Sequence, residues 1–219
     1  RDIVFTLMAP FTGDKQKLVG TTMRFGGISW SDDNFALLSE RWSASRTEKV
    51  SVFQPGAPSQ APRTIIERSS DDLYNDPGSP LFTENAYGRR VLLRKGDLVY
   101  MTSEGGSPEG NMPFLSTFNT KTKEQQILWR SQAPYYERVS KVLTADASSF
   151  ITIKEGIETQ PNYWLRTTKK RMAPKQITAF ADPYPSLKGI QKQLVTYPRK
   201  DGLNLSAILY TPAGYSPEK

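Results

Sequence analysis

The fold is decided by the stretch DDNFALLSE, residues 32–40, in which a polar turn leads into an apolar strand that ends at Glu40. The same shape returns as KGDLVYMTSE at 95–104 and as ASSFITIKE at 147–155. The closing glutamates Glu40, Glu104 and Glu155 are 64 and 51 residues apart. Units that recur at this spacing are typical of repeat folds built from four-stranded sheets.

Each unit can be completed to four strands, because one run of alternating apolar residues precedes the turn and two more follow the glutamate. The predicted strands are 24–30, 35–40, 50–54 and 63–67 in the first unit, 90–94, 98–104, 114–119 and 126–129 in the second, and 141–144, 150–155, 163–166 and 176–180 in the third. Strands 4–8 and 17–20 are predicted to end an earlier unit. We therefore expect an all-β fold, a partial β-propeller of about three and a half four-stranded antiparallel blades. A β-sandwich or a stacked meander of about a dozen strands is the alternative.

The regular pattern stops after Phe180, where Ala181-Asp182-Pro183-Tyr184-Pro185 predicts a stiff, turn-rich segment. We divide the chain into a partial propeller at 1–181, a linker at 182–192 and the start of a second domain at 193–219, with a β-hairpin formed by 194–197 and 205–210. A closed propeller has about four to eight blades. We therefore expect the chain to belong to a longer protein whose further blades precede Arg1.

Composition excludes several kinds of chemistry. The 219 residues include no His and no Cys, so the chain itself cannot supply a Ser-His-Asp or Cys-His catalytic system, an imidazole base, or a zinc site with His or Cys ligands. We predict no catalytic, cofactor-binding or metal-binding residue and no cofactor. The stretches of apolar residues are too short for a membrane span. Absence of Cys leaves the compartment open, and an exported or periplasmic bacterial protein is the interpretation that we favour.

The 29 Lys and Arg residues exceed the 22 Asp and Glu residues, which gives a net charge of +7. The basic residues are scattered, and the one dense run is Lys169, Lys170, Arg171 and Lys175, so no nucleic-acid partner is predicted. A positive field that attracts acidic peptides is a further hypothesis, set against an ordinary solvated basic surface. Its candidates, chosen by charge, are Arg24, Arg41, Arg46, Arg89, Arg90 and Arg94.

A few other residues have both a functional and a structural interpretation. Asp32-Asp33, Asp71-Asp72 and Asp182 are acidic, but each lies at a turn, where an Asp side chain bonds its own backbone, and we favour that role. The Gly-rich loop from Gly105 to Asn111 is either an ordinary surface loop or one that reaches a partner domain. For the four tryptophans we favour packing over ligand stacking; they are Trp30, Trp42, Trp129 and Trp164.

The tail VTYPRKDGLNLSAILYTPAGY, residues 195–215, resembles the crossing from propeller to hydrolase domain in the prolyl oligopeptidase family of serine peptidases. The glutamyl endopeptidase-like branch of that family is indicated by four further segments. They are APFTG at 9–13, DPGSP at 76–80, SPEG at 107–110 with PFL at 113–115, and GIQKQLVTY at 189–197. The resemblance covers essentially the whole chain.

The resemblance implies a parent enzyme with a serine nucleophile on a G-x-S-x-G turn, followed by Asp and His, in an α/β-hydrolase domain. No such turn and no His occur here, so no catalytic residue is transferred to this chain. The implied partners are the missing propeller blades, the C-terminal hydrolase domain and peptide substrates of the parent, and self-association of the isolated chain is expected. The function that we expect is a non-catalytic propeller that restricts access of peptides to the hydrolase domain. The alternative is a stand-alone propeller that serves as an interaction scaffold.

Overall fold

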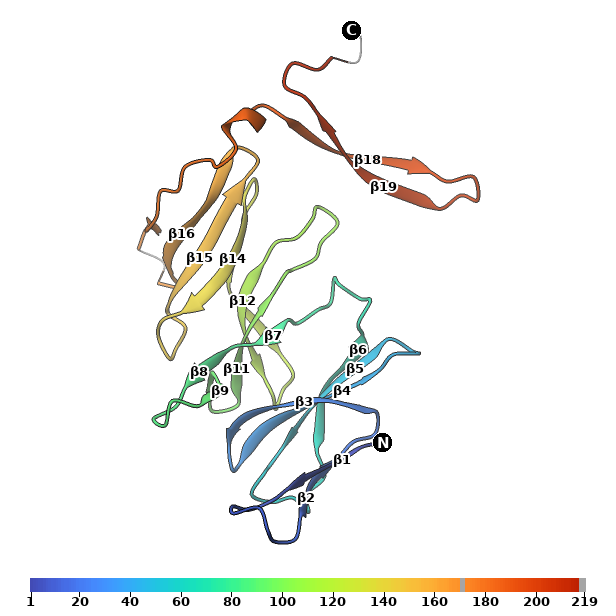
Figure 1. Cartoon of the computed structure of the whole chain (residues 1–219), viewed down its shortest axis with the longest axis vertical. Helices are drawn as coiled ribbons and strands as arrows, with labels where there is room; N and C mark the ends of the chain where they lie inside the picture. The colour runs from blue at the N-terminus through green and yellow to red at the C-terminus, as the bar shows by residue number, and fades with distance from the viewer. Residues whose placement is uncertain (170–171, 217–219) are drawn as a thin grey trace.

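The computed structural model describes residues 1–169 and 172–216, and three sheets stand beside one another in it (Figure 1). The first blade has the order β3-β4-β5-β6, formed by Arg24–Asp32, Phe35–Trp42, Thr47–Phe53 and Arg63–Ser69. The second has the order β10-β11-β12-β13, formed by Arg94–Lys95, Leu98–Ser103, Phe114–Asn119 and Gln125–Arg130. The third has the order β14-β15-β16-β17, formed by Tyr136–Val142, Ser149–Gly156, Thr159–Thr167 and Lys175–Gln176.

Smaller elements flank these blades. β1 (Ile3–Thr6) pairs with β2 (Gln16–Gly20), β8 (Phe82–Glu84) pairs with β9 (Arg90–Leu92), and β7 (Ser79–Pro80) pairs with β11. After a short 3₁₀ turn, η1 (Pro185–Leu187), the chain forms the hairpin of β18 (Gln191–Pro198) and β19 (Asn204–Thr211). All strand pairs are antiparallel, so the prediction of an all-β partial propeller with a final hairpin is confirmed.

The second strand of each blade explains why the sheets stack. Side chains alternate between the two faces of a strand. In β4, Phe35 and Leu37 belong to the apolar cluster shared with the second blade, whereas Ala36 and Leu38 pack with the β1–β2 sheet. Both faces of the sheet are therefore covered, which accounts for the four consecutive buried residues at the start of β4.

The second and third blades meet in the same way. In β11, Val99 and Met101 pack toward the first blade, and Tyr100 between them packs toward the third. Phe150 of β15 is fully buried in that contact and lies edge-on to the ring of Trp129, with 5.6 Å between ring centroids. We call the contact surface between adjacent blades a seam, and each seam has an apolar cluster.

Some strand boundaries differ from the sequence prediction. The predicted strand 90–94 is divided between β9 and β10, and the first strand of the third blade begins at Tyr136 rather than at Lys141. The predicted strand 176–180 contributes only Lys175–Gln176 to the sheet. Strand β18 begins at Gln191, inside the predicted linker, and the division into 1–181, 182–192 and 193–219 stays a prediction.

Three further observations complete the description of the fold. Lys170 and Arg171 of the basic run and residues 217–219 of the predicted last domain lie outside the described residues. Within the part of the chain that the structure describes, no helix has the length and apolar character needed to cross a membrane. The β18–β19 hairpin projects away from the three blades (Figure 1).

Candidate functional site

The loops at one end of the blades face the projecting hairpin, and we call this end the hairpin-facing rim (Figure 1). Because Glu40, Glu104 and Glu155 close equivalent strands, the three second strands end at the same rim. The connection that follows each of them differs in length: residues 43–46 in the first blade, 104–113 in the second and 157–158 in the third. Loop 70–78, between β6 and β7, lies at the same end.

In the first blade, Glu40 is a buried structural carboxylate, 4% exposed. Its Oε2 lies 2.7 Å from Nζ of Lys49, and its Oε1 accepts the backbone N–H groups of Thr22 and Met23. Burial alone would raise the pKa of Glu40, but the bonds from Lys49 and these two N–H groups outweigh it, so its pKa lies below the ordinary value. Glu40 therefore holds the segment at Thr22 and Met23, just before β3, in place. Its carboxylate is occupied by these bonds and is not accessible to a ligand.

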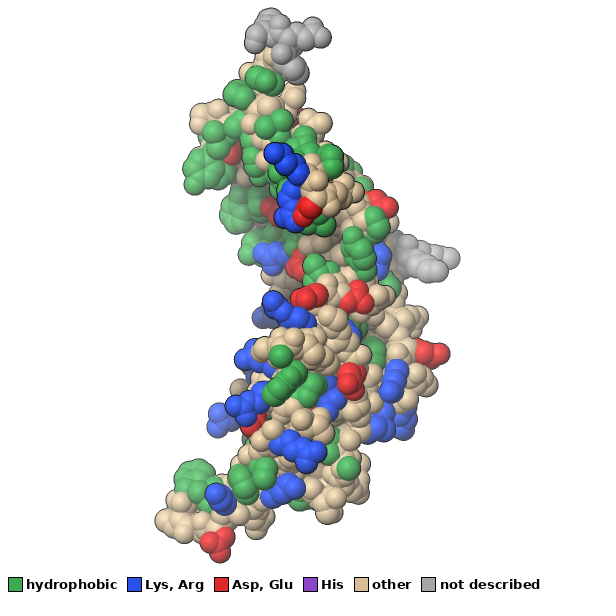
Figure 2. Space-filling view, turned by 90° about the vertical axis from the view of Figure 1, so that its right-hand side faces the viewer, with side chains coloured by type: hydrophobic (Ala, Val, Ile, Leu, Met, Phe, Trp, Pro, Cys, Tyr) green, Lys and Arg blue, Asp and Glu red, His purple; other side chains and the backbone are tan. Residues whose placement is uncertain are grey.

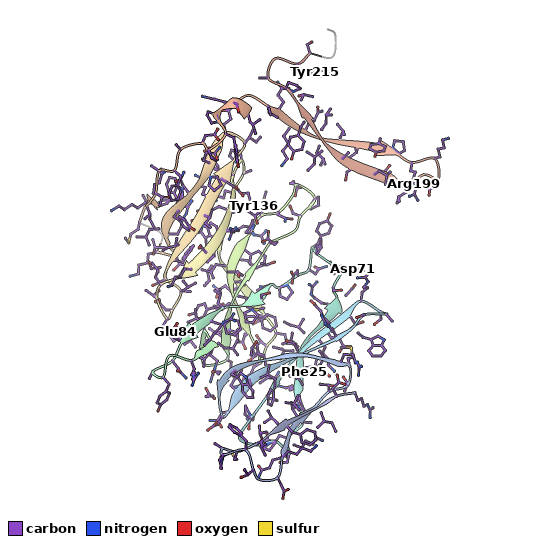
Figure 3. The ribbon with its side chains drawn as sticks, viewed as in Figure 1. Phe25, Asp71, Glu84, Tyr136, Arg199 and Tyr215 are labelled. Carbon is purple, nitrogen blue, oxygen red and sulfur yellow. The ribbon has the colours of Figure 1, made fainter. Side chains whose placement is uncertain are left out.

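In the second blade, Glu104 is exposed and reaches across to the third blade. The hydroxyl of Tyr136 donates to Oε2 of Glu104 at 2.7 Å. Burial first, and then the hydrogen bond to this carboxylate, raises the pKa of Tyr136 to about 12. Tyr136 is therefore a neutral hydrogen-bond donor at physiological pH. Figure 3 labels Tyr136 at the start of the third blade.

Deeper in the same seam lies a second carboxylate, Glu137, which is 3% exposed. Arg166 binds it in bidentate fashion, with Nε 2.8 Å from Oε1 and Nη2 2.6 Å from Oε2. The hydroxyl of Thr152 donates to Oε1 of Glu137, and the guanidinium of Arg166 lies 5.9 Å from the ring centroid of Trp129. This part of the seam is polar and paired: Glu137, Thr152 and Arg166 join the three long strands of the third blade, and Arg166 reaches Trp129 of the second blade.

The acidic residues singled out in the sequence serve mainly as turn residues. Asp32 accepts the N–H of Asn34 at 2.9 Å and is also paired with Arg94. Asp72 accepts the N–H of Asn75 at 3.2 Å, and Asp182 accepts the N–H of Tyr184 at 2.8 Å. The turn interpretation is confirmed for these three carboxylates. Among residues 1–169 and 172–216, the structure shows no group of three or more His, Cys, Asp or Glu side chains that could hold a metal.

The six candidate arginines do not share one surface. Arg24 and Arg41 are cross-strand partners at the hairpin-facing end of the first blade, and Arg46 lies in the turn after β4. Arg89 and Arg90 belong to the β8–β9 hairpin and Arg94 to strand β10, which lie at the opposite end. Figure 3 labels Asp71 and Glu84, which mark these two sides of the molecule.

Several of these arginines are also engaged in contacts with neighbouring residues. Arg24 pairs with Asp2 at 2.9 Å, Arg94 pairs with Asp32, and the guanidinium of Arg90 lies 3.8 Å from the ring centroid of Phe82. On the side of the molecule seen in Figure 2, acidic and basic side chains are interspersed. The geometry therefore favours an ordinary solvated basic surface over a single positive field that attracts acidic peptides.

The tryptophans differ in their surroundings. Trp129 packs in the seam as predicted, and Trp30 lies edge-on to Phe53 with 6.5 Å between ring centroids. Trp164 lies under the ammonium group of Lys154, 4.9 Å from its ring centroid, whereas Trp42 at the end of β4 is 47% exposed. Packing is confirmed for Trp129, and Trp42 is an exposed rim residue.

The sequence interpretation missed Tyr136, Glu137 and Arg166. The segment that carries the first two was read as a connection before a strand at 141–144, so no face was assigned to them. The one available signal was the alternation of Tyr136, Arg138 and Ser140 with Glu137, Val139 and Lys141, which a bulge between Val139 and Lys141 interrupts.

Comparison with known proteins adds two findings on sequence. No family model matches the chain. A probable chloroplastic glutamyl endopeptidase of Arabidopsis thaliana is 35% identical over 236 aligned residues, which cover 100% of this chain and 24% of that protein. Its counterpart in Oryza sativa subsp. japonica is 34% identical over 237 aligned residues, which cover 100% of this chain and 25% of that protein. The chain therefore spans about a quarter of the length of the curated relatives that it matches.

A solved structure supports the fold. A putative dipeptidyl aminopeptidase IV from Bacteroides ovatus superposes with a TM-score of 0.51 at 17% sequence identity, over 96% of this chain and 37% of that chain. At this identity the match concerns the fold alone. The resemblance to the glutamyl endopeptidase-like branch rests on the two sequence relatives and is confirmed by them.

Proposed function

Because the chain is glutamyl endopeptidase-like along its whole length, we propose that it is the non-catalytic propeller part of a serine peptidase of the prolyl oligopeptidase family, and that it restricts the access of substrates to a hydrolase domain. The peptide-bond hydrolysis itself belongs to that domain in this proposal. The observation that carries the proposal, beyond the sequence match, is the exposed apolar surface of the β18–β19 hairpin, which projects away from the blades.

The hairpin presents apolar side chains on both of its faces. Leu194 and Ile208 are cross-strand partners on one face and are 67% and 51% exposed. Tyr197 and Leu209 lie on the opposite face and are 47% and 46% exposed. A two-stranded hairpin is marginally stable alone, and a sheet with apolar residues on both faces is normally covered on both sides. This pattern supports a second domain that incorporates the hairpin.

The rim loops support the part of the proposal that concerns access. Loop 70–78 and loop 104–113 approach each other closely, since a Cβ on Gly106 would lie 2.9 Å from the carbonyl oxygen of Leu73. Arg68 anchors the first of these loops through Asp76 at 3.0 Å and through the carbonyl of Asp72. A substrate that passes this rim on its way to a domain attached at the hairpin meets these loops first.

The access role is tested in the complete peptidase with two substrates that share one cleavable sequence, a short peptide and the same sequence within a folded protein. Residues 106–111 are replaced by two glycines, which leaves the Gly105–Met112 backbone bond at the base of the loop. We expect cleavage of the protein substrate relative to the peptide to rise several-fold. The matched control is Lys121→Ala, which removes an exposed ion pair with Asp97 at the opposite end of the second blade. An unchanged ratio in the loop variant would refute the access role.

The scaffold alternative makes a different prediction. A stand-alone propeller has no use for a hairpin that is apolar on both faces, so replacing Leu194 and Leu209 with Ser would leave its partner binding unchanged. In a peptidase the same double substitution should lower the yield of active enzyme, because both faces of the hairpin lose contacts.

A further inference from the structure

Loop 104–113 is almost self-contained. The N–H of Met112 donates to the carbonyl of Gly105 at 2.9 Å and closes the base of the loop. Ser107 and Gly110 exchange backbone hydrogen bonds of 3.1 and 3.0 Å at its tip. Among the described residues, the hydrogen bond from Tyr136 to Glu104 is the one hydrogen bond that joins residues 104–112 to another blade.

The same carboxylate oxygen also binds Asn111, on the side of the loop that leads back into β12. Oε2 of Glu104 accepts the Tyr136 hydroxyl at 2.7 Å and lies 3.5 Å from Nδ2 of Asn111. Oε2 of Glu104 therefore joins the start of the loop, its end at Asn111, and Tyr136 of the third blade. This atom is on an exposed side chain, so water can compete for each of its bonds.

The base of the loop is tightly closed at Gly105, whose N–H donates to the hydroxyl of Ser103 at 3.1 Å. Gly105 has φ of +60°, and a Cβ at this position would lie 2.1 Å from the carbonyl oxygen of Met112. Only glycine allows the two arms to approach this closely. The loop is therefore closed at its base by the backbone, lies against Leu73 of loop 70–78 at Gly106, and is hydrogen-bonded to the third blade through one side chain.

We propose that Glu104 and Tyr136 form a latch between the second and third blades, and that breaking it releases loop 104–113 as a unit that turns about the Gly105–Met112 base. The loop is then the movable part of the hairpin-facing rim. The use of this movement in substrate access rests on the proposed function, but the latch itself does not.

The latch is tested by distance measurements between pairs of spin labels on the 219-residue chain. The chain has no Cys, so introduced cysteines are labelled selectively. One pair is Glu109→Cys at the exposed tip of the loop and Glu158→Cys at the exposed turn of the third blade. The control pair, Ser45→Cys with Glu158→Cys, spans the rim without including the loop.

For the first pair of labels, in the chain without further substitutions, we expect one narrow distribution of distances. In Tyr136→Phe, which removes a single hydroxyl, the population at a second distance should rise several-fold, as the loss of one water-exposed hydrogen bond implies. Glu104→Ala should act at least as strongly, because it also frees Asn111. Glu104→Gln keeps an acceptor oxygen and should stay closer to the parent chain.

Two results would overturn the latch. One is an unchanged distribution for the first pair in both Tyr136→Phe and Glu104→Ala. The other is an equal change in the control pair, which would show that the blades move and that the loop does not move separately. Neither result depends on peptidase activity, so failure of the latch and failure of the access role are distinguishable.

Discussion

Removing Arg166 should strongly destabilise the third blade, on the face that packs against the second blade. In Arg166→Met, the carboxylate of Glu137 loses a bidentate partner at 2.6 and 2.8 Å while it remains 3% exposed. Leaving one member of a buried ion pair without its partner costs about 3–5 kcal/mol. Since domains are typically stable by about 5–15 kcal/mol, this is a large part of the total free energy of unfolding.

The double variant Glu137→Met/Arg166→Met separates the charge effect from the loss of packing. Replacing both charges with apolar side chains of similar size leaves no buried unpaired charge, so we expect it to recover most of the loss. Urea unfolding followed by tryptophan fluorescence reports on this region, because Trp129 lies beside both Arg166 and Phe150. A loss below about 1 kcal/mol in Arg166→Met, in the range of exposed ion pairs, would refute the assignment of a buried, tightly coupled pair.

Three further predictions concern the isolated chain. It should not hydrolyse peptides that contain Glu, or simple esters, because it has no His; turnover that persists after contaminating serine peptidases are inhibited would contradict this. It should self-associate through exposed apolar surface such as that of Leu194 and Ile208, so light scattering should show a mass that rises with concentration, and a constant monomer mass would be the contrary result. The lowered pKa of Glu40 means that its ionised form contributes stability above the ordinary pKa of 4.5, and that this contribution is lost as the pH falls through the lowered value. Stability measured by circular dichroism should therefore depend less steeply on pH below 4.5 in Glu40→Gln than in the parent chain or in the exposed control Glu124→Gln, and equal slopes would contradict the role of Glu40.

The inner strands of the blades were predictable because tertiary packing reinforces their local pattern. The predicted strand 114–119 coincides with β12, and 35–40 lies within β4. In these strands both faces are buried against neighbouring sheets, which accounts for the continuous apolar run at 35–38 in β4 and for the buried Leu115 and Phe118 on opposite faces of β12. The repeat of turn, strand and glutamate adds the spacing that distinguishes stacked blades from one continuous sheet.

The first strands were harder to predict because tertiary contacts override their local pattern. Leu92 packs toward the first blade, while Leu93 packs toward the third. The chain changes partner between them, from β8 to β11, and what looked like one strand is divided. In β14 a bulge between Val139 and Lys141 shifts the register, so the alternation used to find strands is broken there.

The short strand β7 shows a limit of another kind. Ser79-Pro80 follows Asp76-Pro77-Gly78, a sequence typical of a turn, and Pro80 lacks an N–H to donate to a sheet. The pairing with β11 depends on Gly78, whose φ is +94° and where a Cβ would lie 2.1 Å from the carbonyl oxygen of Thr102. This close approach involves a strand more than twenty residues away, which a local pattern does not reveal.

The repeated glutamate illustrates why the position of a site is easier to predict than its role. Glu40 and Glu104 occupy equivalent places at the end of a second strand, and the backbone delivers both to the hairpin-facing rim. Glu40 meets Lys49 on the next strand and becomes a buried structural ion pair. The second blade continues into loop 104–113 instead of a tight turn, so Glu104 stays exposed and its nearest donor is Tyr136 of another blade. The repeat sets where the carboxylate is placed, and the length of the following loop and the residue across the seam decide whether it holds a core together or holds a movable loop.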